Sequence, residues 1–481
     1  MSLTITNSPV AALEPVYNNL WFRLTSTLST EPDFKYCFKI NLINPVTNTD
    51  HTFISPIKLF PESDGSGLFS PARILESYLS FDFSPFGSGF TDCQNSLLQY
   101  KVKFGEELTL TAVTFSSITN NAGQTQYNLN SVASPQFLIG DVIKIDKTYK
   151  NYNIQYDGLQ TITSVSGADI TTDKSFGSAN VESGSCISRL TYQTAITTSG
   201  TCYNGTRQYN EGYSTDFANR YILADASKKF LTDLSGDINI GTNDVFTLGA
   251  VKPNDGSSGV TNALVFTYDS TDGTIGVYEV YKSYSPYDIF NFRCGTNNLA
   301  QTFGYDQVSS TMKQVYTSEV KKYQVVLMSG SSIQMSEIRT FIVNDNCTPG
   351  YVRLAWLNPA GQFSFMNFSM KSRRKLETNR QMVTKLLPYD YSIGDRSEMI
   401  TGTKVNEIIT LNSEYMTDIE ARHLQGLYVG SEAYWIPANS TNYFPIVILS
   451  KEYLQKSSEN DELVAYQIEV RFAYDQNIQR N

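Results

Sequence analysis

Histidine, the residue most often used as a catalytic base, is scarce in this chain. The sequence has 481 residues and only 2 histidines, His51 and His423. A Ser-His-Asp or Cys-His arrangement requires an imidazole, so at most these two positions are able to support one. His423 falls on a segment expected to form a helix, where we favour a surface or interface role. The sequence has no Walker loop, dinucleotide fingerprint, zinc-protease helix or Gly-x-Ser-x-Gly elbow.

One acidic segment has the spacing of a calcium loop but does not complete the pattern. Asp233, Ser235, Asp237 and Asn239 stand at every second position, as the first ligands of such a loop do. The sixth position is not glycine, and the twelfth, which should be glutamate, is Asp244. We therefore interpret the segment as a polar turn and expect no bound metal.

The cysteines also argue against a metal centre. None of the 6 lies in a Cys-x-x-Cys pair, although structural zinc is normally held by closely spaced ligand pairs. A disulfide between Cys186 and Cys202 is possible by sequence, but a reducing compartment favours buried free thiols. The cysteines are Cys37, Cys93, Cys186, Cys202, Cys294 and Cys347. We expect them to pack in the core, and we expect no cofactor.

Two further clusters of charge are candidates for chemistry or binding. Glu106-Glu107 and Asp461-Glu462 are adjacent carboxylates, and a glycosidase needs only such a pair, yet nothing in the pattern places either pair in a cleft. The basic cluster is Lys371-Ser-Arg373-Arg374-Lys375. Such a cluster is most often a solvated loop, whereas the sharper hypothesis is a patch that docks on an acidic neighbour.

The composition favours a large β-rich structural or binding protein. The formal net charge is −10, which argues against a sequence-independent DNA or RNA binder. Aromatic residues make up 13% of the chain, including 31 Tyr and 27 Phe, and they favour strands over helices. The N-terminus lacks the basic and apolar regions of a secretory signal, and no run of apolar residues is long enough for a membrane span. We therefore expect folding in a cytoplasm.

Local patterns predict antiparallel β-sandwich-like domains with a few short helices and an inserted small β-barrel. Residues 34–42 alternate with a period of two, and tight Gly-containing turns separate short runs typical of an SH3-like or OB-like barrel. Hairpins are predicted at 264–278 and 356–365. The predicted domains are 1–120 (a sandwich with one short helix), 121–190 (the inserted barrel), 191–375 (a second β-domain) and 376–481 (an α+β segment packed on the β-domains).

The C-terminal part also contains a predicted helix start. Thr417 and Glu420 have the spacing of a capping box, in which each side chain bonds to the other residue's backbone amide. No repeat of fixed period is visible, so neither a solenoid nor a propeller is expected.

Several segments outside the barrel-like insertion share a strand-and-turn style around a few aromatic residues. They are Tyr351–Phe365, Gly205–Tyr209, Phe230–Thr232, Ser431–Pro437, Phe444–Ile448, Phe472–Tyr474 and Asn477–Arg480. Together they resemble tail and connector structural proteins of phages of Bacteroidetes bacteria, above all the crAss-like podoviruses, and the resemblance covers roughly the chain outside the insertion.

The resemblance implies a non-enzymatic virion protein that forms an oligomeric ring in the tail barrel or the head-tail connector, or a tail-hub component. Its partners would be further copies of itself, the portal and neighbouring ring or hub proteins, and DNA would pass through without specific binding. The virion tail would be its location, after synthesis in the host bacterial cytoplasm. Candidate interface residues are Trp356, Trp435, Tyr443, Arg373 and Arg374. For the three aromatic residues a place in the core is the alternative, and the one we favour.

Two other classes of function remain open at this point. A receptor-binding tail fibre or adhesin would bind a glycan through Tyr and Trp on exposed loops, although fibres usually show repeats. A virion-associated polysaccharide hydrolase would depend on one of the carboxylate pairs, and we regard it as the weakest of the three hypotheses.

Overall fold

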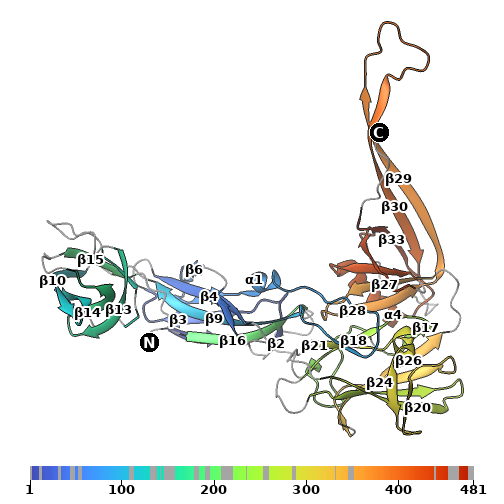
Figure 1. Cartoon of the computed structure of the whole chain (residues 1–481), viewed down its shortest axis with the longest axis horizontal. Coiled ribbons are helices and arrows are strands. Elements are labelled where there is room, and N and C mark those ends of the chain that lie inside the picture. Colours follow the sequence, from blue (N-terminus) through green and yellow to red (C-terminus); the bar gives the residue numbers. More distant parts are fainter. Residues whose placement is uncertain are drawn as a thin grey trace. The chain divides into compact units, whose positions relative to one another are not determined.

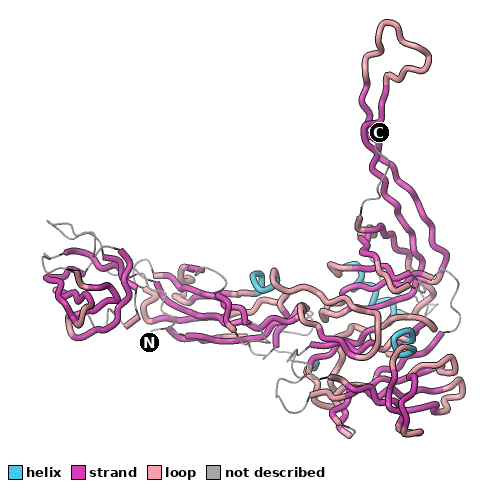
Figure 2. The backbone as a smooth tube through the Cα atoms, viewed as in Figure 1, coloured by secondary structure: helices cyan, strands magenta, loops and turns pink. Residues whose placement is uncertain are grey.

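Strands dominate the chain in the computed structural model (Figure 2), which confirms the expectation of a mainly β protein. The chain forms two compact units, residues 1–79 with 98–203 and residues 80–97 with 204–481. The structure describes residues 3–9, 13–30, 34–43, 49–52, 57–107, 113–130, 137, 139–140, 142–145, 158–177, 184–189, 196–206, 220–234, 236–252, 259–283, 289–330, 332–344, 351–437, 440–452 and 465–474.

The first unit contains a sandwich of two sheets around one hydrophobic core. One sheet has the strand order β1-β3-β7, and the other has the order β2-β16-β9-β4-β5 with β6 paired to β4. Phe38 stacks on Phe69 from the opposite sheet with ring centroids 4.3 Å apart, because alternate side chains of each strand point inward. The elements are β1 (Leu3–Asn7), β2 (Leu13–Pro15), β3 (Phe22–Ser26), β4 (Lys35–Ile43), β5 (Asp50–Thr52), β6 (Ile57–Leu59), β7 (Gly67–Phe69), α1 (Ala72–Glu76), β9 (Leu97–Glu107) and β16 (Ile196–Tyr203).

The inserted element of the first unit is a closed barrel in the order β10-β11-β14-β13-β12-β15. Its core includes Phe115, Tyr127, Ile143 and Ile162. The strands are β10 (Val113–Asn121), β11 (Gln124–Leu129), β12 (Val142–Ile145), β13 (Gly158–Ser166), β14 (Asp169–Ser175) and β15 (Gly184–Arg189). The barrel thus begins at Val113, and the boundary predicted at 120/121 falls inside its first hairpin.

The described residues of the second unit form three sheets. The largest runs β17-β26-β24-β19-β20-β22-β23, with β25 paired to β24, and a small sheet runs β18-β21-β8. Both predicted hairpins are confirmed, as β19–β20 and β27–β28. The elements are β8 (Phe90–Asp92), β17 (Ile238–Gly241), β18 (Thr247–Val251), β19 (Asn262–Tyr268), β20 (Thr274–Tyr281), β21 (Ile289–Arg293), α3 (Thr296–Ala300), β22 (Phe303–Asp306), β23 (Thr311–Gln314), β24 (Lys322–Ser329), β25 (Ile333–Gln334) and β26 (Arg339–Asn344).

The third sheet of this unit has the order β28-β27-β31-β32-β33-β30-β29. Ala355 and Leu357 belong to the core shared with the other sheets, whereas Leu354 and Trp356 pack with the helix α4 (Asp418–Val429). The remaining elements are β27 (Val352–Leu357), β28 (Phe363–Phe368), β29 (Met370–Thr384), β30 (Glu398–Asn412), β31 (Ala433–Pro437), β32 (Phe444–Ile448) and β33 (Gln467–Phe472). Because one sheet joins 352–368 to 370–472, the boundary predicted at 375/376 falls within β29.

The capping box predicted at the start of α4 is present. The Thr417 hydroxyl accepts a hydrogen bond from the Glu420 backbone N–H, and the Glu420 carboxylate accepts one from the Thr417 N–H. The helices of the described segments include none that is both long and apolar enough to cross a membrane.

Candidate functional site

His423 is a buried residue, which corrects the expected surface or interface role. Its side chain is 6% exposed, and burial lowers its pKa below the usual value, against the opposing effect of Asp233. Burial has the opposite effect on the Asp233 carboxyl group, whose pKa it raises, because in both cases burial disfavours the charged form. The Ser364 hydroxyl donates a hydrogen bond of 2.8 Å to the Asp233 carboxylate. These groups tie α4 to the segment before β17 and to the sheet beneath it.

The calcium-like segment is not a simple polar turn, because Ile238–Gly241 forms the strand β17. Asp244 lies in the loop that follows and is 1% exposed. In the described segments, no group of three or more His, Cys, Asp or Glu side chains is placed to hold a metal ion.

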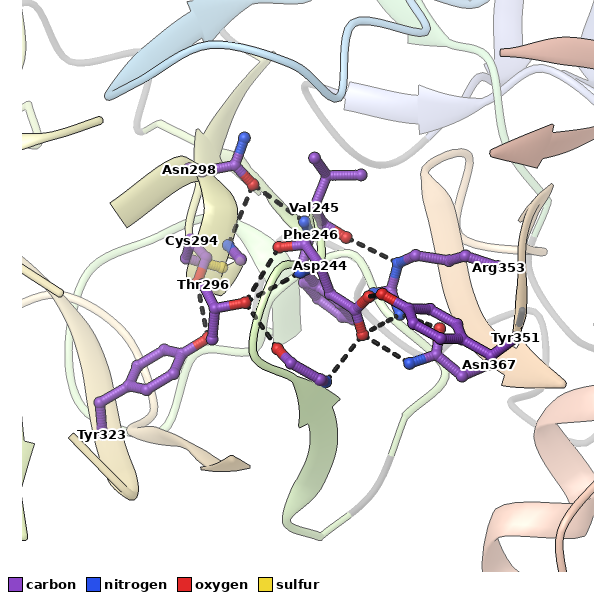
Figure 3. A network of polar contacts seen from close by, with 12 residues as sticks. Asp244, Val245, Phe246, Cys294, Thr296, Asn298, Tyr323, Tyr351, Arg353 and Asn367 are labelled. Atoms are coloured by element: carbon purple, nitrogen blue, oxygen red, sulfur yellow. Dashed lines mark hydrogen bonds and ion pairs between the residues drawn. The ribbon is translucent and has the colours of Figure 1, made fainter. Parts of the chain in front are cut away.

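Asp244 is instead the centre of a buried polar network (Figure 3). Its carboxylate accepts hydrogen bonds from the Tyr351 hydroxyl at 2.7 Å, the Arg353 guanidinium at 2.9 Å and the Asn367 amide at 2.5 Å. The Gly241 backbone N–H donates to the same carboxylate at 2.7 Å. The network joins the loop after β17 to β27 and β28. Its groups are occupied with one another, so we assign it a structural role.

The two carboxylate pairs and His51 do not form a catalytic site among the described residues. Glu106 is buried, and Glu107 forms ion pairs with Lys58 at 2.6 Å and Lys35 at 3.9 Å. The pair Asp461-Glu462 lies outside the described residues. Strand β5 contains His51, whose side chain also lies outside the described part.

Four cysteines are buried free thiols, and this includes Cys202 of the considered disulfide. Burial raises the pKa of Cys37 to about 12, so its thiol stays protonated and unreactive at neutral pH. The four are Cys37, Cys93, Cys202 and Cys294. The side chains of Cys186 and Cys347 lie outside the described residues.

The two tryptophans named as candidate interface anchors lie in the core, which confirms the alternative that we favoured and corrects the interface assignment. Trp356 is 1% exposed and Trp435 is 8% exposed, and both belong to the hydrophobic cluster beneath α4. Tyr443 is partly exposed, and its ring packs against Phe83 and Tyr434. Arg373 and Arg374 are exposed on β29, so their basic cluster is part of a strand and not of a solvated loop.

The most unusual surface of the second unit is the hairpin Met370–Asn412, which we call the arm. It consists of β29 and β30, of 15 residues each, and the connection 385–397 between them. Strand β33 pairs with β30 only over Ile408–Asn412, so the rest of the arm extends beyond the sheet as a two-stranded ribbon (Figure 1). An isolated two-stranded hairpin is at best marginally stable in water.

The arm exposes an unusual amount of apolar surface. Leu386, Tyr389 and Ile393, at its tip, are fully exposed. Further large apolar side chains exposed along it are Leu376, Met382, Val383, Leu387, Tyr391, Met399 and Ile400. Contiguous exposed apolar surface of this kind marks an interaction site. In addition, most of the backbone edge of the arm is open. Among the described residues, β29 pairs only with β30, and β30 has a second neighbour, β33, only over Ile408–Asn412. Open strand edges favour pairing with another chain.

The arm also differs in charge from the rest of the chain. The arm contains eight Lys and Arg and five Asp and Glu, so its formal net charge is +3. The whole chain has a net charge of −10, so the rest of the chain carries −13. Arg374 pairs with Glu407 and Lys375 with Glu377. Six cations of the arm have no carboxylate partner in the part of the chain that is described: Lys371, Arg373, Arg380, Lys385, Arg396 and Lys404.

A pocket of about 160 Å³ opens at the base of the arm. Ser369, which precedes β29, and Glu414, which follows β30, both line it, together with residues of β17 and α4. Its rings include Tyr351, Trp356 and Tyr415. Sequence reasoning missed both the pocket and the arm; only the basic cluster at the start of β29 pointed toward either.

Comparison with known proteins leaves the chain without an assigned family. No family model matches it, and no curated protein matches it. Among solved structures, the N-terminal four Ig domains of Dscam1 isoform 1.9 match with 7% identity, covering 85% of this chain and 95% of that one, at a TM-score of 0.12. A similarity of that strength carries no argument about fold or function.

Proposed function

We propose that this chain is a non-enzymatic structural protein of a bacteriophage tail, which assembles with copies of itself into a ring of the tail barrel or head-tail connector. The observation that carries the proposal is the arm, a long ribbon with exposed apolar side chains and open strand edges. Since such a ribbon is marginal alone, a neighbouring surface is the natural source of its stability. The assignment to a phage rests on the sequence resemblance around Trp356 and Trp435.

Self-association through the arm fits a closed ring better than a two-fold dimer. The arm is one segment of the chain and differs in charge and shape from the rest. The surface of another copy that binds the arm is therefore a different patch from the arm itself. Contacts between different patches are heterologous, and they generate rings when the rotation closes. In such a ring each copy both extends an arm and receives one.

The charge of the protein supports a conduit for DNA more than a DNA-binding surface. The chain is acidic overall, and an acidic lumen repels phosphates, so DNA slides without being held. The proposal therefore includes passage of the genome during ejection, synthesis in the host bacterial cytoplasm, and contacts with the portal and neighbouring ring or hub proteins.

Electron microscopy of the purified full-length chain tests the proposal. We expect closed rings with an open centre wide enough for a DNA duplex. Elongated trimers would support the second candidate function, a receptor-binding fibre or adhesin. That candidate is favoured by Tyr389 and Tyr391 at the tip of the arm, which are exposed and are of a type that concentrates in binding sites. Particles that stay monomeric at all concentrations would contradict both.

A further inference from the structure

We infer that the arm of one copy docks at the base of the arm of a second copy, where a lysine or arginine side chain enters the pocket. The inference rests on the proposed function, because it names the surface that receives the arm. Three observations support it: the pocket has an acidic and aromatic lining, the arm carries cations without a carboxylate partner among the described residues, and the tip of the arm lies far from the pocket of its own chain.

The pocket has the lining of a site for an organic cation. Three carboxylates line it, those of Asp237, Glu414 and Glu420, and none of its described lining residues is Lys or Arg. None of the three carboxylates forms an ion pair with another described residue. The aromatic rings of Tyr351 and Tyr415 lie in the same lining, and ring faces attract ammonium and guanidinium groups.

The size of the pocket suits one side chain. Its volume is about 160 Å³, and a cavity of roughly 150 Å³ holds a benzene-sized molecule. Trp356 also lines the pocket, so the lining combines carboxylates with aromatic surface. The arm carries cationic and apolar side chains next to one another, so it matches both parts of this lining, whereas a free metal cation would match only the carboxylates.

The arm supplies the complementary charge. Its six cations without a carboxylate partner in the described chain extend from the base of β29 to the tip and back along β30. Arginine is the better anchor of the two residue types, because its planar fork pairs with a carboxylate through two hydrogen bonds and stacks on rings. The exposed apolar side chains around these cations would be covered in the same contact.

The receiving pocket must belong to another copy, because the arm leads away from its own. Ser369 and Glu414 flank the two ends of the arm and line the pocket. Each strand has 15 residues, and at about 3.3 Å per residue the tip lies roughly 50 Å from the base. A paired ribbon does not fold back on its own base, whereas the next copy in a ring presents the same pocket to it.

Charge reversal in the full-length chain tests this inference, with the native mass as the measurement. The pocket variant carries Asp237→Lys and Glu414→Lys, and the arm variant carries Arg380→Glu, Lys385→Glu and Arg396→Glu. Each is expected to raise the protein concentration needed for half-assembly by about tenfold or more, since close charge pairs at interfaces are strongly coupled. The combined variant restores oppositely charged surfaces and is expected to recover most of the assembly.

The control is a charge reversal that lies outside both the arm and the pocket. Lys451→Glu changes an exposed cation outside both surfaces and should assemble like the wild type. Failure of the combined variant to recover, or loss of assembly in the arm variant but not in the pocket variant, would overturn the inference without contradicting assembly of the wild type. The latter result would indicate that the arm docks on a different surface of the second copy. A wild type that never assembles would overturn the inference and the proposed function together.

Discussion

Asp244 and Arg353 form a buried ion pair of 2.9 Å, although 109 residues of sequence separate them. Their side chains are 1% and 4% exposed. The guanidinium also donates to the Val245 carbonyl at 2.9 Å and to the Asn367 side chain at 2.6 Å. A buried charge is tolerated only when it is paired and hydrogen-bonded, so this pair fixes the loop after β17 against β27.

Replacing Asp244 with Asn is therefore expected to destabilise the second unit strongly. The change leaves the Arg353 charge buried without a partner, which typically costs about 3–5 kcal/mol of unfolding free energy. Chemical denaturation followed by tryptophan fluorescence measures it, because Trp356 and Trp435 both lie in this unit.

The matched control for that variant is Asp272→Asn. Asp272 also forms an ion pair, with Lys322 at 3.0 Å, but its side chain is 72% exposed. Exposed pairs contribute about 1 kcal/mol or less. Equal losses of unfolding free energy in the two variants would contradict a larger contribution from the buried pair than from the exposed one.

Gly361 is expected to be intolerant of even one added methyl group. Its φ is +81°, and a Cβ built on it would lie 1.9 Å from the Asn204 carbonyl oxygen. Gly361→Ala should therefore lower the unfolding free energy by more than the about 1–2 kcal/mol that a left-handed backbone costs alone. Gly330→Ala isolates that backbone cost, because Gly330 has a φ of +64° and open space around it. Similar losses from the two substitutions would contradict the close approach.

The burial of His423 predicts a loss of stability in mild acid. Its pKa is lowered in the folded protein, so below about pH 6.5 the unfolded chain binds the proton more readily. The unfolding free energy should then fall as the pH falls through that value. Asp233 acts in the opposite direction: its pKa is raised, so its contribution is lost as the pH rises. Arg339 and Glu420 also act on His423.

Comparison of the wild type with His423→Gln isolates the histidine in that balance. The variant should lose less stability than the wild type between about pH 7 and pH 5, since glutamine does not titrate there. Denaturation curves at a series of pH values measure the difference. Identical pH dependence in the two proteins would contradict the buried, neutral imidazole.

The parts of the fold that the sequence predicted correctly depend on local chemistry. The turn at Asn358–Gly361 joins β27 to β28 because its turn residues suit a hairpin, and the capping box of Thr417 and Glu420 likewise lies within one turn of helix. The boundary predicted at 120/121 failed because the residues around the tight turn at Ala122-Gly123, both with positive φ, are as polar as those of a linker.

The surfaces were harder to predict than the fold. Trp356 and Trp435 were proposed as anchors because aromatic residues serve both cores and interfaces, and only tertiary packing separates the two uses. The arm lacks the one-sided apolar alternation of a strand that covers a core, so its pattern did not indicate strands. Its sequence carries charges and apolar residues on both faces, as suits a ribbon that meets another chain.

The most direct test of the account is the native mass of the full-length chain at increasing concentration, beside a variant with Leu386→Ser, Tyr389→Ser and Ile393→Ser. These three side chains are fully exposed at the tip of the arm, so their replacement should leave the folded monomer intact. We predict that the wild type forms a closed high-mass species and that the variant remains smaller at the same concentrations. Equal assembly of the two proteins, or a wild type that stays monomeric, would contradict self-assembly through the arm.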